Sequence, residues 1–315
     1  MSESHADGAG LAVIAEAEVE VGAISPRDPA SLAVGASLAE GVRRLRADQE
    51  SAGRCEVEGV HKMRGAARFL RSELVAFRPL IDPGAAEGLA DELRWLSGTL
   101  GAVRDLHVLR AYLRDAAGEA CEALSPLFES LDRHYEMAAF TLGIALRGDR
   151  CRDLLARLSA LARDPSPTDE AGGPCREVLP PRVAASWRKL KKRGRALDHS
   201  DPDEAFHEVR KYAKRARFAA EAVAPVLGSS SRKCALRFAR LAKGVQDALG
   251  THQDAVIARA AVGRVAAEHQ HDGAFNLAAG RLLEKLDHAA REARDDFPAA
   301  WSKLDRKKHL RWLKP

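Results

Sequence analysis

Apolar residues along this chain recur three or four positions apart, which is the spacing that places them on one face of an α-helix. In the segment after Pro29, for example, Leu38, Val42 and Leu45 follow this spacing. Every long segment has the same period, and none gives a convincing strand pattern. The sequence therefore predicts an all-α protein.

A cluster of Pro, Gly, Ser and Asp divides the helical pattern into two halves. This cluster covers residues 165–174, and we interpret it as a linker. The expected organisation is a disordered acidic arm over 1–28, a first helical repeat over 29–164 and a second repeat over 175–315. In the first half, the expected helices cover about 29–52, 57–77, 85–117, 125–147 and 149–163, and the third has a break or bend near Leu100-Gly101. In the second half, they cover about 175–197 and 203–224, and further helical segments continue to near Arg294. A basic C-terminal piece follows Pro298.

Two of the expected helices carry the same pattern of cations. Residues 60–71 and 206–217 both contain His-x2-Arg-x3-(Arg or Lys)-x2-Arg. On a helix these four positions fall within roughly 80° of one another, so each copy forms a stripe along one face. Cations at this spacing repel one another, which predicts a polyanion held between the two helices. The stripe residues are His61, Arg64, Arg68 and Arg71 in the first copy and His207, Arg210, Lys214 and Arg217 in the second.

A second motif follows each stripe and extends the repeat. Residues 100–105 read Leu-Gly-Ala-Val-Arg-Asp, and residues 249–254 read Leu-Gly-Thr-His-Gln-Asp. The same offset aligns Arg94 with Lys243. Two helical halves with the same order of motifs indicate a duplicated bundle, in which a pseudo-two-fold relation brings the two stripes face to face across a shared groove.

The residues that the two copies of this second motif share favour structural roles. Gly101 and Gly250 permit either close packing or a bend. Asp105 and Asp254 either pair with a stripe cation or cap a helix. We therefore interpret the motif as part of the scaffold around the stripes.

The stripe side chains are suited to holding phosphate. Arginine offers forked donors that match phosphate oxygens two at a time, whereas Lys214 offers a point charge. A neighbouring polyanion is expected to raise the pKa of a stripe histidine, so that both ring nitrogens donate. No nucleophile stands next to a base in this pattern, so the sequence predicts no catalytic residue.

The charge distribution also favours an anionic partner. The formal net charge is +5, but residues 1–30 carry six acids and one arginine. The remaining residues, 31–315, therefore have a net charge of +10. A basic body of this kind is typical of proteins that bind nucleic acid, membrane surfaces or phosphate polymers.

Other features exclude several classes of protein. The five cysteines form no Cys-x2-Cys pair, which argues against a zinc site or a disulfide framework. No apolar run approaches 18 residues, so we expect no membrane insertion. The N-terminus lacks a signal-peptide pattern, and we expect a cytoplasmic protein. His269 and His271 lie in a polar stretch without metal-ligand spacing, which we interpret as a solvated loop, and we expect no metal or cofactor.

The doubled His-x2-Arg-x3-(Arg/Lys)-x2-Arg motif, each copy followed by its Leu-Gly-x3-Asp element, resembles the CHAD family of histidine-containing α-helical domains over roughly residues 30–315. The resemblance implies two four-helix bundles related by pseudo-two-fold symmetry around a basic central cavity. It also implies binding of inorganic polyphosphate and targeting to polyphosphate granules. The cavity ligands that it implies are His61, Arg64, Arg68, Arg71, His207, Arg210, Lys214 and Arg217, with Arg94 and Lys243 as additions and Arg44 as a weaker one.

Two departures from the family pattern stand out. Gln253 occupies the position of Arg104 in the second copy, so the two halves are expected to bind unequally. Many relatives carry an N-terminal CYTH triphosphatase domain with a Glu-x-Glu-x-Lys signature. Residues 16–20 read Glu-Ala-Glu-Val-Glu without the lysine, and we interpret them as a chance acidic patch or a remnant.

Three functions remain open on the sequence alone. The first is non-enzymatic polyphosphate binding, in a scaffold or granule-associated protein. The second is nucleic-acid binding through the same basic surface, although 16 aromatic residues are few for a stacking platform. The third is a polyphosphate-processing enzyme, although phosphoryl transfer usually enlists metal-binding carboxylates that the stripes lack.

Overall fold

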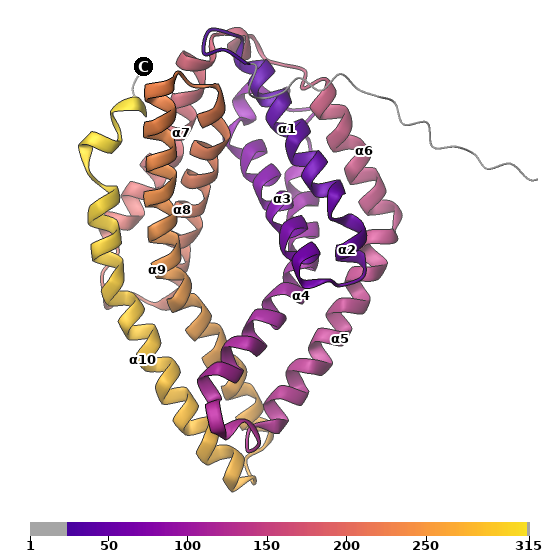
Figure 1. Ribbon diagram of the computed structural model, residues 1–315, viewed down its shortest axis with the longest axis vertical. Coiled ribbons are helices and arrows are strands. Elements are labelled where there is room, and N and C mark those ends of the chain that lie inside the picture. The colour runs from indigo at the N-terminus through magenta and orange to yellow at the C-terminus, as the bar shows by residue number, and fades with distance from the viewer. Residues whose placement is uncertain (1–23, 314–315) are drawn as a thin grey trace, which may run out of the picture.

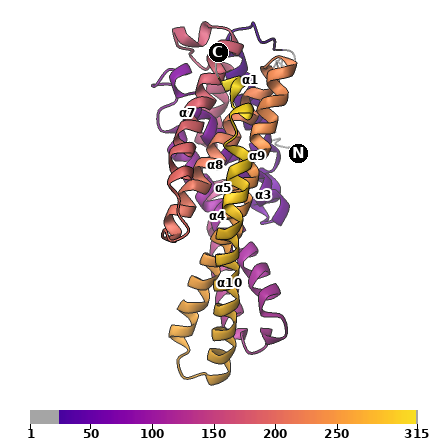
Figure 2. The same cartoon turned by 90° about the vertical axis from the view of Figure 1, so that its left-hand side faces the viewer.

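The computed structural model describes residues 24–313, and within this range the protein is built from ten α-helices with short 3-10 turns and no strand. This confirms the predicted all-α class. Figure 1 shows the helices of the first half on one side of an elongated molecule and those of the second half on the other. The same molecule is much narrower when turned by 90°, and α10 runs along most of its long axis (Figure 2).

The two halves share one packing order around their stripe helices, although the first contains six α-helices and the second four within the described residues. The helices of the first half are α1 (Ala30–Ala47), α2 (Gln49–Gly53), α3 (Val57–Ala76), α4 (Leu89–Ala117), α5 (Ser125–Arg147) and α6 (Asp149–Arg163), and those of the second are α7 (Cys175–Ala196), α8 (Asp203–Val223), α9 (Ser229–Glu268) and α10 (Gly273–Leu304). Helix α3 packs between α1 and α4, and α8 packs in the same way between α7 and α9. The predicted duplication is therefore present in the fold.

The halves meet through pairs of corresponding helices. Helix α3 contacts α8, and α4 contacts α9. Contacts between an element and its own counterpart are what a pseudo-two-fold axis produces, because only elements near the axis can meet their symmetry mates. This arrangement places the two stripe-bearing helices next to each other.

Two apolar cores hold the halves together, one toward each end of the molecule. The larger core includes Leu70 of α3, Leu190 of α7 and Phe238 of α9, all fully or almost fully buried. The second core joins the distal parts of α4, α5, α9 and α10 and includes Leu113 and Phe275. Burying apolar surface at both ends stabilises the relative placement of the halves.

Two expectations about helix boundaries are wrong. Helix α4 is continuous from Leu89 to Ala117, with no break at Leu100-Gly101. Helix α10 continues through Pro298 to Leu304, where the sequence suggested an end near Arg294. The helix is held on both sides of the proline because Trp301 stacks on Phe297 and on Trp187 of α7, with ring centroids 5.9 and 5.8 Å apart. Tertiary packing here offsets the lost backbone hydrogen bond.

The segment before α1 is anchored to the predicted linker. Ile24 is buried, and the backbone oxygens of Pro26 and Asp28 accept hydrogen bonds from the first residues of α7. The linker itself lies between α6 and α7 and contains a 3-10 turn, η4 (Asp169–Gly172). The predicted acidic arm therefore includes five residues, 24–28, that are held against the body, and its other residues, 1–23, lie outside the described range.

Candidate anion-binding site

The two stripes lie on the facing sides of α3 and α8, and their longer side chains are half-buried. Only 22% of the Arg64 side chain and 16% of the Arg217 side chain are exposed. Arg68, Arg71, Arg210 and Lys214 are also half-buried, whereas His61 is exposed. The sequence pattern put these cations on one face of each helix, and the fold turns both faces inward.

In each half, one motif glycine lies against a stripe arginine, and we call this glycine the seat of that arginine. A Cβ atom on Gly101 of α4 would lie 3.3 Å from Nε of Arg64. A Cβ atom on Gly250 of α9 would lie 3.6 Å from Nε of Arg210. Both motif glycines therefore pack against a stripe arginine. The 3.3 Å contact at Gly101 is tighter than a Cβ atom normally makes, so the missing side chain gives Arg64 room there, whereas 3.6 Å at Gly250 is an ordinary van der Waals contact.

The motif aspartates lie beside the same arginines. Asp105 accepts a hydrogen bond from Nη2 of Arg64 at 3.0 Å, which realises the predicted pairing with a stripe cation. Asp254 is its counterpart on α9. Desolvation raises the pKa of the Asp254 carboxyl, and nearby Asp105 adds to this, while Arg210 and Arg104 act in the opposite direction. The two carboxylates thus lie close enough to interact, at the junction of the two halves.

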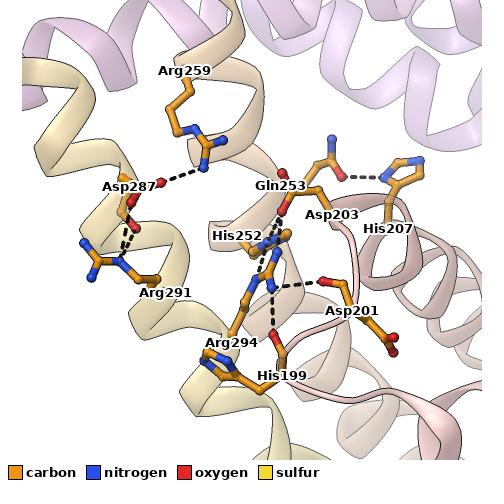
Figure 3. A network of polar contacts seen from close by, with 10 residues as sticks. All are labelled: His199, Asp201, Asp203, His207, His252, Gln253, Arg259, Asp287, Arg291 and Arg294. Atoms are coloured by element: carbon orange, nitrogen blue, oxygen red, sulfur yellow. Dashed lines mark hydrogen bonds and ion pairs between the residues drawn. The ribbon is translucent and has the colours of Figure 1, made fainter. Parts of the chain in front are cut away.

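The two stripe histidines differ in their partners. Nε of Arg104 donates to Nδ1 of His61 at 3.2 Å, so this ring nitrogen must carry a lone pair. In the second half, Nδ1 of His207 lies 2.6 Å from Oε1 of Gln253 (Figure 3), and here the ring nitrogen can donate. Nδ1 of His61 therefore accepts a hydrogen bond, whereas Nδ1 of His207 faces an amide oxygen and can donate one. The substitution of Gln253 for Arg104 makes the halves unequal at this point.

A polar network anchors the start of α8 in the second half only. Figure 3 shows Arg294 of α10 reaching Asp203 and the backbone oxygens of His199 and Asp201. Nε2 of buried His252 lies 3.0 Å from Asp203 Oδ1. Burial lowers the pKa of His252, which favours its neutral form despite the aspartate. The network fixes the helix turn that precedes His207.

Sequence reasoning missed this network because it has no counterpart in the first half. The 146-residue offset between the stripes aligns Asp203 with Val57, which is apolar. In the sequence, Arg104 and Gln253 stand out only as a mismatch between the repeats. Each lies three residues after a motif glycine, Gly101 or Gly250, and this helical spacing is the sequence signal that places them near the stripes.

The stripe cations crowd one another at the centre of the interface. Burial, together with the charges of nearby Arg64, Arg210 and Arg217, lowers the pKa of Arg68 to about 10, although Asp105 acts in the opposite direction. Burial also lowers the pKa of Arg64 and Arg71, with smaller effects from neighbouring arginines. This crowding is unfavourable in the absence of an anion, and a bound anion would relieve it.

Several of these half-buried arginines have a buried Nε donor without an acceptor among the described residues. Among the described residues, no hydrogen-bond partner reaches Nε of Arg64, Arg71, Arg210 or Arg217. Glu221 is nearest to Arg217, but its oxygen lies 3.6 Å from Nε. The four arginines form two symmetry-related pairs, 64 with 210 and 71 with 217. Buried donors are normally satisfied, so four unsatisfied ones in a repeated arrangement indicate a site for acceptor oxygens.

The additional predicted ligands lie at the edge of this cluster. Arg94 is exposed and pairs with Asp91 at 2.7 Å, but it is close enough to Arg71 to affect that side chain's pKa. Lys243 is exposed and pairs with Asp247 at 2.5 Å. Arg44 belongs to α1, where it pairs with Glu40 at 2.6 Å. These three residues therefore lie outside the most crowded group of cations, in which Arg64, Arg210 and Arg217 surround Arg68.

Residues 24–313 contain no group of three or more His, Cys, Asp or Glu side chains arranged to hold a metal ion. In the same range, no helix is both long and apolar enough to cross a membrane.

The fold and the site together define a duplicated all-α protein with a cationic interface between its halves. The chain belongs to the CHAD domain family, because a profile of that family matches residues 36–263. This confirms the resemblance on which the ligand set was based.

Comparison with known proteins agrees with this family. Two Mycobacterium tuberculosis proteins, "Uncharacterized protein MT2285" of strain CDC 1551 and "Uncharacterized protein Rv2226" of strain H37Rv, are each 29% identical to the chain over 317 residues. The alignment covers 94% of this chain and 57% of each relative, so the chain spans little more than half of their length.

Two solved structures share the fold. PptA from Streptomyces chartreusis superposes with a TM-score of 0.74 at 24% identity, covering 87% of this chain and 99% of that one. The CHAD domain from the plant Ricinus communis superposes with a TM-score of 0.70 at 23% identity, covering 89% and 94%. At these identities the likeness shows the fold.

Proposed function

We propose that this protein binds inorganic polyphosphate, without turning it over, between the stripes of α3 and α8. The observation that carries the proposal is the two symmetry-related pairs of arginines whose buried Nε donors have no acceptor within residues 24–313. Phosphate oxygens would satisfy these donors with charge-assisted hydrogen bonds. The proposed ligands are the eight stripe residues, with Arg94 and Lys243 at the edge.

A chain of phosphates suits this site better than a single phosphate group. The cations of each stripe extend over about two to three helical turns, and the two stripes face each other. A single phosphate could neutralise one or two of these guanidinium groups, whereas a polymer presents a charge at every unit along its length. The polymer would therefore relieve the repulsion around Arg68 most completely.

The proposed role is binding rather than catalysis. The nearby carboxylates, Asp105 and Asp254, both lie beside arginines, with which they interact. Phosphoryl transfer generally needs carboxylates that hold a metal ion near the phosphates. We accordingly expect no phosphate release when polyphosphate is incubated with the protein and Mg²⁺ or Mn²⁺. Release that depends on protein concentration would contradict the non-enzymatic role.

A competition titration tests the proposed ligand. We expect polyphosphate to bind more tightly than DNA, RNA or ATP when they are compared at equal charge. Affinity should fall steeply between low and high salt, because each phosphate contact releases counterions. Displacement of polyphosphate by an equal charge of DNA or RNA would favour a nucleic-acid-binding function instead.

The glycine seats supply a prediction with a matched control. Replacing Gly101 by leucine should weaken polyphosphate binding about tenfold, because the new side chain occupies the seat of Arg64 and disturbs one charge-assisted contact. Gly98 lies one helical turn earlier on α4, and a Cβ atom there would meet nothing within 4 Å. Gly98→Leu should therefore leave the affinity unchanged. Isothermal titration of both variants measures the difference, and an equal loss in both would rule out the seat.

A further inference from the structure

Helix α5 presents three large apolar side chains to solvent. Met137, Phe140 and Ile144 are 69%, 72% and 54% exposed. Figure 1 shows α5 along the outer edge of the first half. The other exposed large apolar side chains within residues 24–313 are dispersed, and no two of them lie on neighbouring turns of one helix. An exposed apolar cluster generally marks a contact surface, because leaving it in water is unfavourable.

The three apolar side chains share one helical face with Arg147, which is also exposed. Positions 137, 140, 144 and 147 are spaced by three, four and three residues, as are the a and d positions of a coiled coil. On α5 they fall within roughly 80° of one another and extend over about 15 Å. We call these four residues the α5 seam. Because the stem of an exposed arginine can cover an apolar neighbour while its guanidinium group stays in water, Arg147 suits the end of such a seam. The α5 seam therefore fits a second helix.

A second copy of the α5 seam is complementary to the first when the two helices run antiparallel. In a register centred on position 142, Phe140 of each copy lies opposite the partner's Ile144, and Met137 lies opposite the partner's Arg147. Glu136, which is exposed beside the seam, then meets the guanidinium group of the partner's Arg147. A parallel pairing would instead place the two Arg147 side chains opposite each other, where they repel. Charge therefore favours the antiparallel pairing.

We propose that α5 is a homodimer interface in which the α5 seams of two copies pack antiparallel. A second copy is the fitting partner because one helix supplies the apolar surface and both members of each charge pair. The seam covers only two to three turns, so the dimer should be weak, with a dissociation constant on the order of 10 μM. This association does not depend on the proposed polyphosphate function and can be measured without polyphosphate.

Sedimentation velocity of the full chain, without polyphosphate, tests the interface. The native protein should pass from monomer to dimer between about 1 and 100 μM. Phe140→Ser should weaken the dimer at least about 100-fold, because each dimer loses two buried aromatic side chains. Leu277→Ser is the matched control, since Leu277 is 61% exposed on α10 and lies outside the seam. This control should leave the dissociation constant unchanged.

Exchange of charges tests the antiparallel register. Glu136→Arg and Arg147→Glu should each weaken the dimer about tenfold at low salt, because like charges then replace both ion pairs. Mixing the two single variants should restore association, because unlike charges face each other again at both contacts. A chain with both substitutions keeps the native net charge and should dimerise like the native protein. Recovery in the mixture also excludes misfolding as the cause of the loss in each single variant.

Several results would overturn the proposal. A native protein that remains monomeric at about 100 μM would do so. A dimer that persists in Phe140→Ser, or that Leu277→Ser weakens equally, would show that the copies associate through another surface. Single charge variants that stay dissociated when mixed would contradict the antiparallel pairing of Glu136 with Arg147.

Discussion

Replacing Arg64 and Arg210 together by alanine is expected to weaken polyphosphate binding by about 100-fold to 10,000-fold while leaving the helical fold intact. Each side chain offers a buried guanidinium group with an unsatisfied Nε donor. A hydrogen bond to a charged group contributes about 1.5–3 kcal/mol, and every 1.4 kcal/mol changes a dissociation constant about tenfold. Titration calorimetry measures the affinity, and circular dichroism measures the helix content.

The fold should survive this double substitution because it removes two mutually repelling charges. The substitution of Arg64 leaves Asp105 without its ion-pair partner, but the Asp105 side chain is 59% exposed and therefore remains hydrated. Arg133→Ala with Arg281→Ala is a control that removes the same charge from exposed positions on α5 and α10. If the control weakens binding as much as the site variant, the affinity reflects net charge rather than the stripes. Unchanged affinity in the site variant would refute the proposed site.

Replacing Glu73 by glutamine is expected to stabilise the protein at pH 8 by about 2–4 kcal/mol and to change little at pH 4.5. Glu73 of α3 is almost completely buried, and burial raises the pKa of its carboxyl to about 8. Contact with Ser37 and the charge of Arg44 lower this pKa, but burial outweighs both. The second carboxyl oxygen has no hydrogen-bond partner among the described residues, so ionisation there is poorly compensated.

The direction of this pH dependence follows because the folded protein keeps a proton on the Glu73 carboxyl. Because the folded pKa lies above the unfolded value of about 4.5, the stability contributed by protonated Glu73 is complete below pH 4.5 and is lost as pH rises toward 8. Thermal unfolding at several pH values measures this loss, and the difference from Glu73→Gln isolates it from other groups. The exposed Glu129→Gln serves as a control and should follow the native protein. A constant difference between native protein and Glu73→Gln across this range would contradict the buried, protonated state.

Most of the fold was predictable because helical periodicity is a local property of the chain. The stripes could be found for the same reason, since a cation every three or four residues marks one helical face. The relation between the stripes came from the repeat itself, because duplicated halves usually associate through equivalent surfaces. Helices α3 and α8 do contact each other in this way.

Other features depended on contacts that no local pattern records. A glycine within a helical pattern suggested a break near Leu100, yet Gly101 lies within a continuous helix. The glycine is explained by Arg64 of another helix, which lies where a side chain at position 101 would be. Pro298 suggested the end of a helix, yet aromatic stacking around Trp301 keeps α10 intact. In both cases, a contact with a residue distant in sequence explains why the helix contains a residue that weakens it locally.

Local patterns in the sequence are enough to predict a helical, duplicated protein in which each half carries one cationic face. The environment of those faces depends on contacts between helices. These contacts bury the Nε donors, give the two histidines different partners in Arg104 and Gln253, and anchor the start of α8 through Arg294. The physical reason is that periodicity depends on backbone geometry, which acts over a few residues. Burial, hydrogen bonding and charge crowding depend on distances between helices, which exist only after folding.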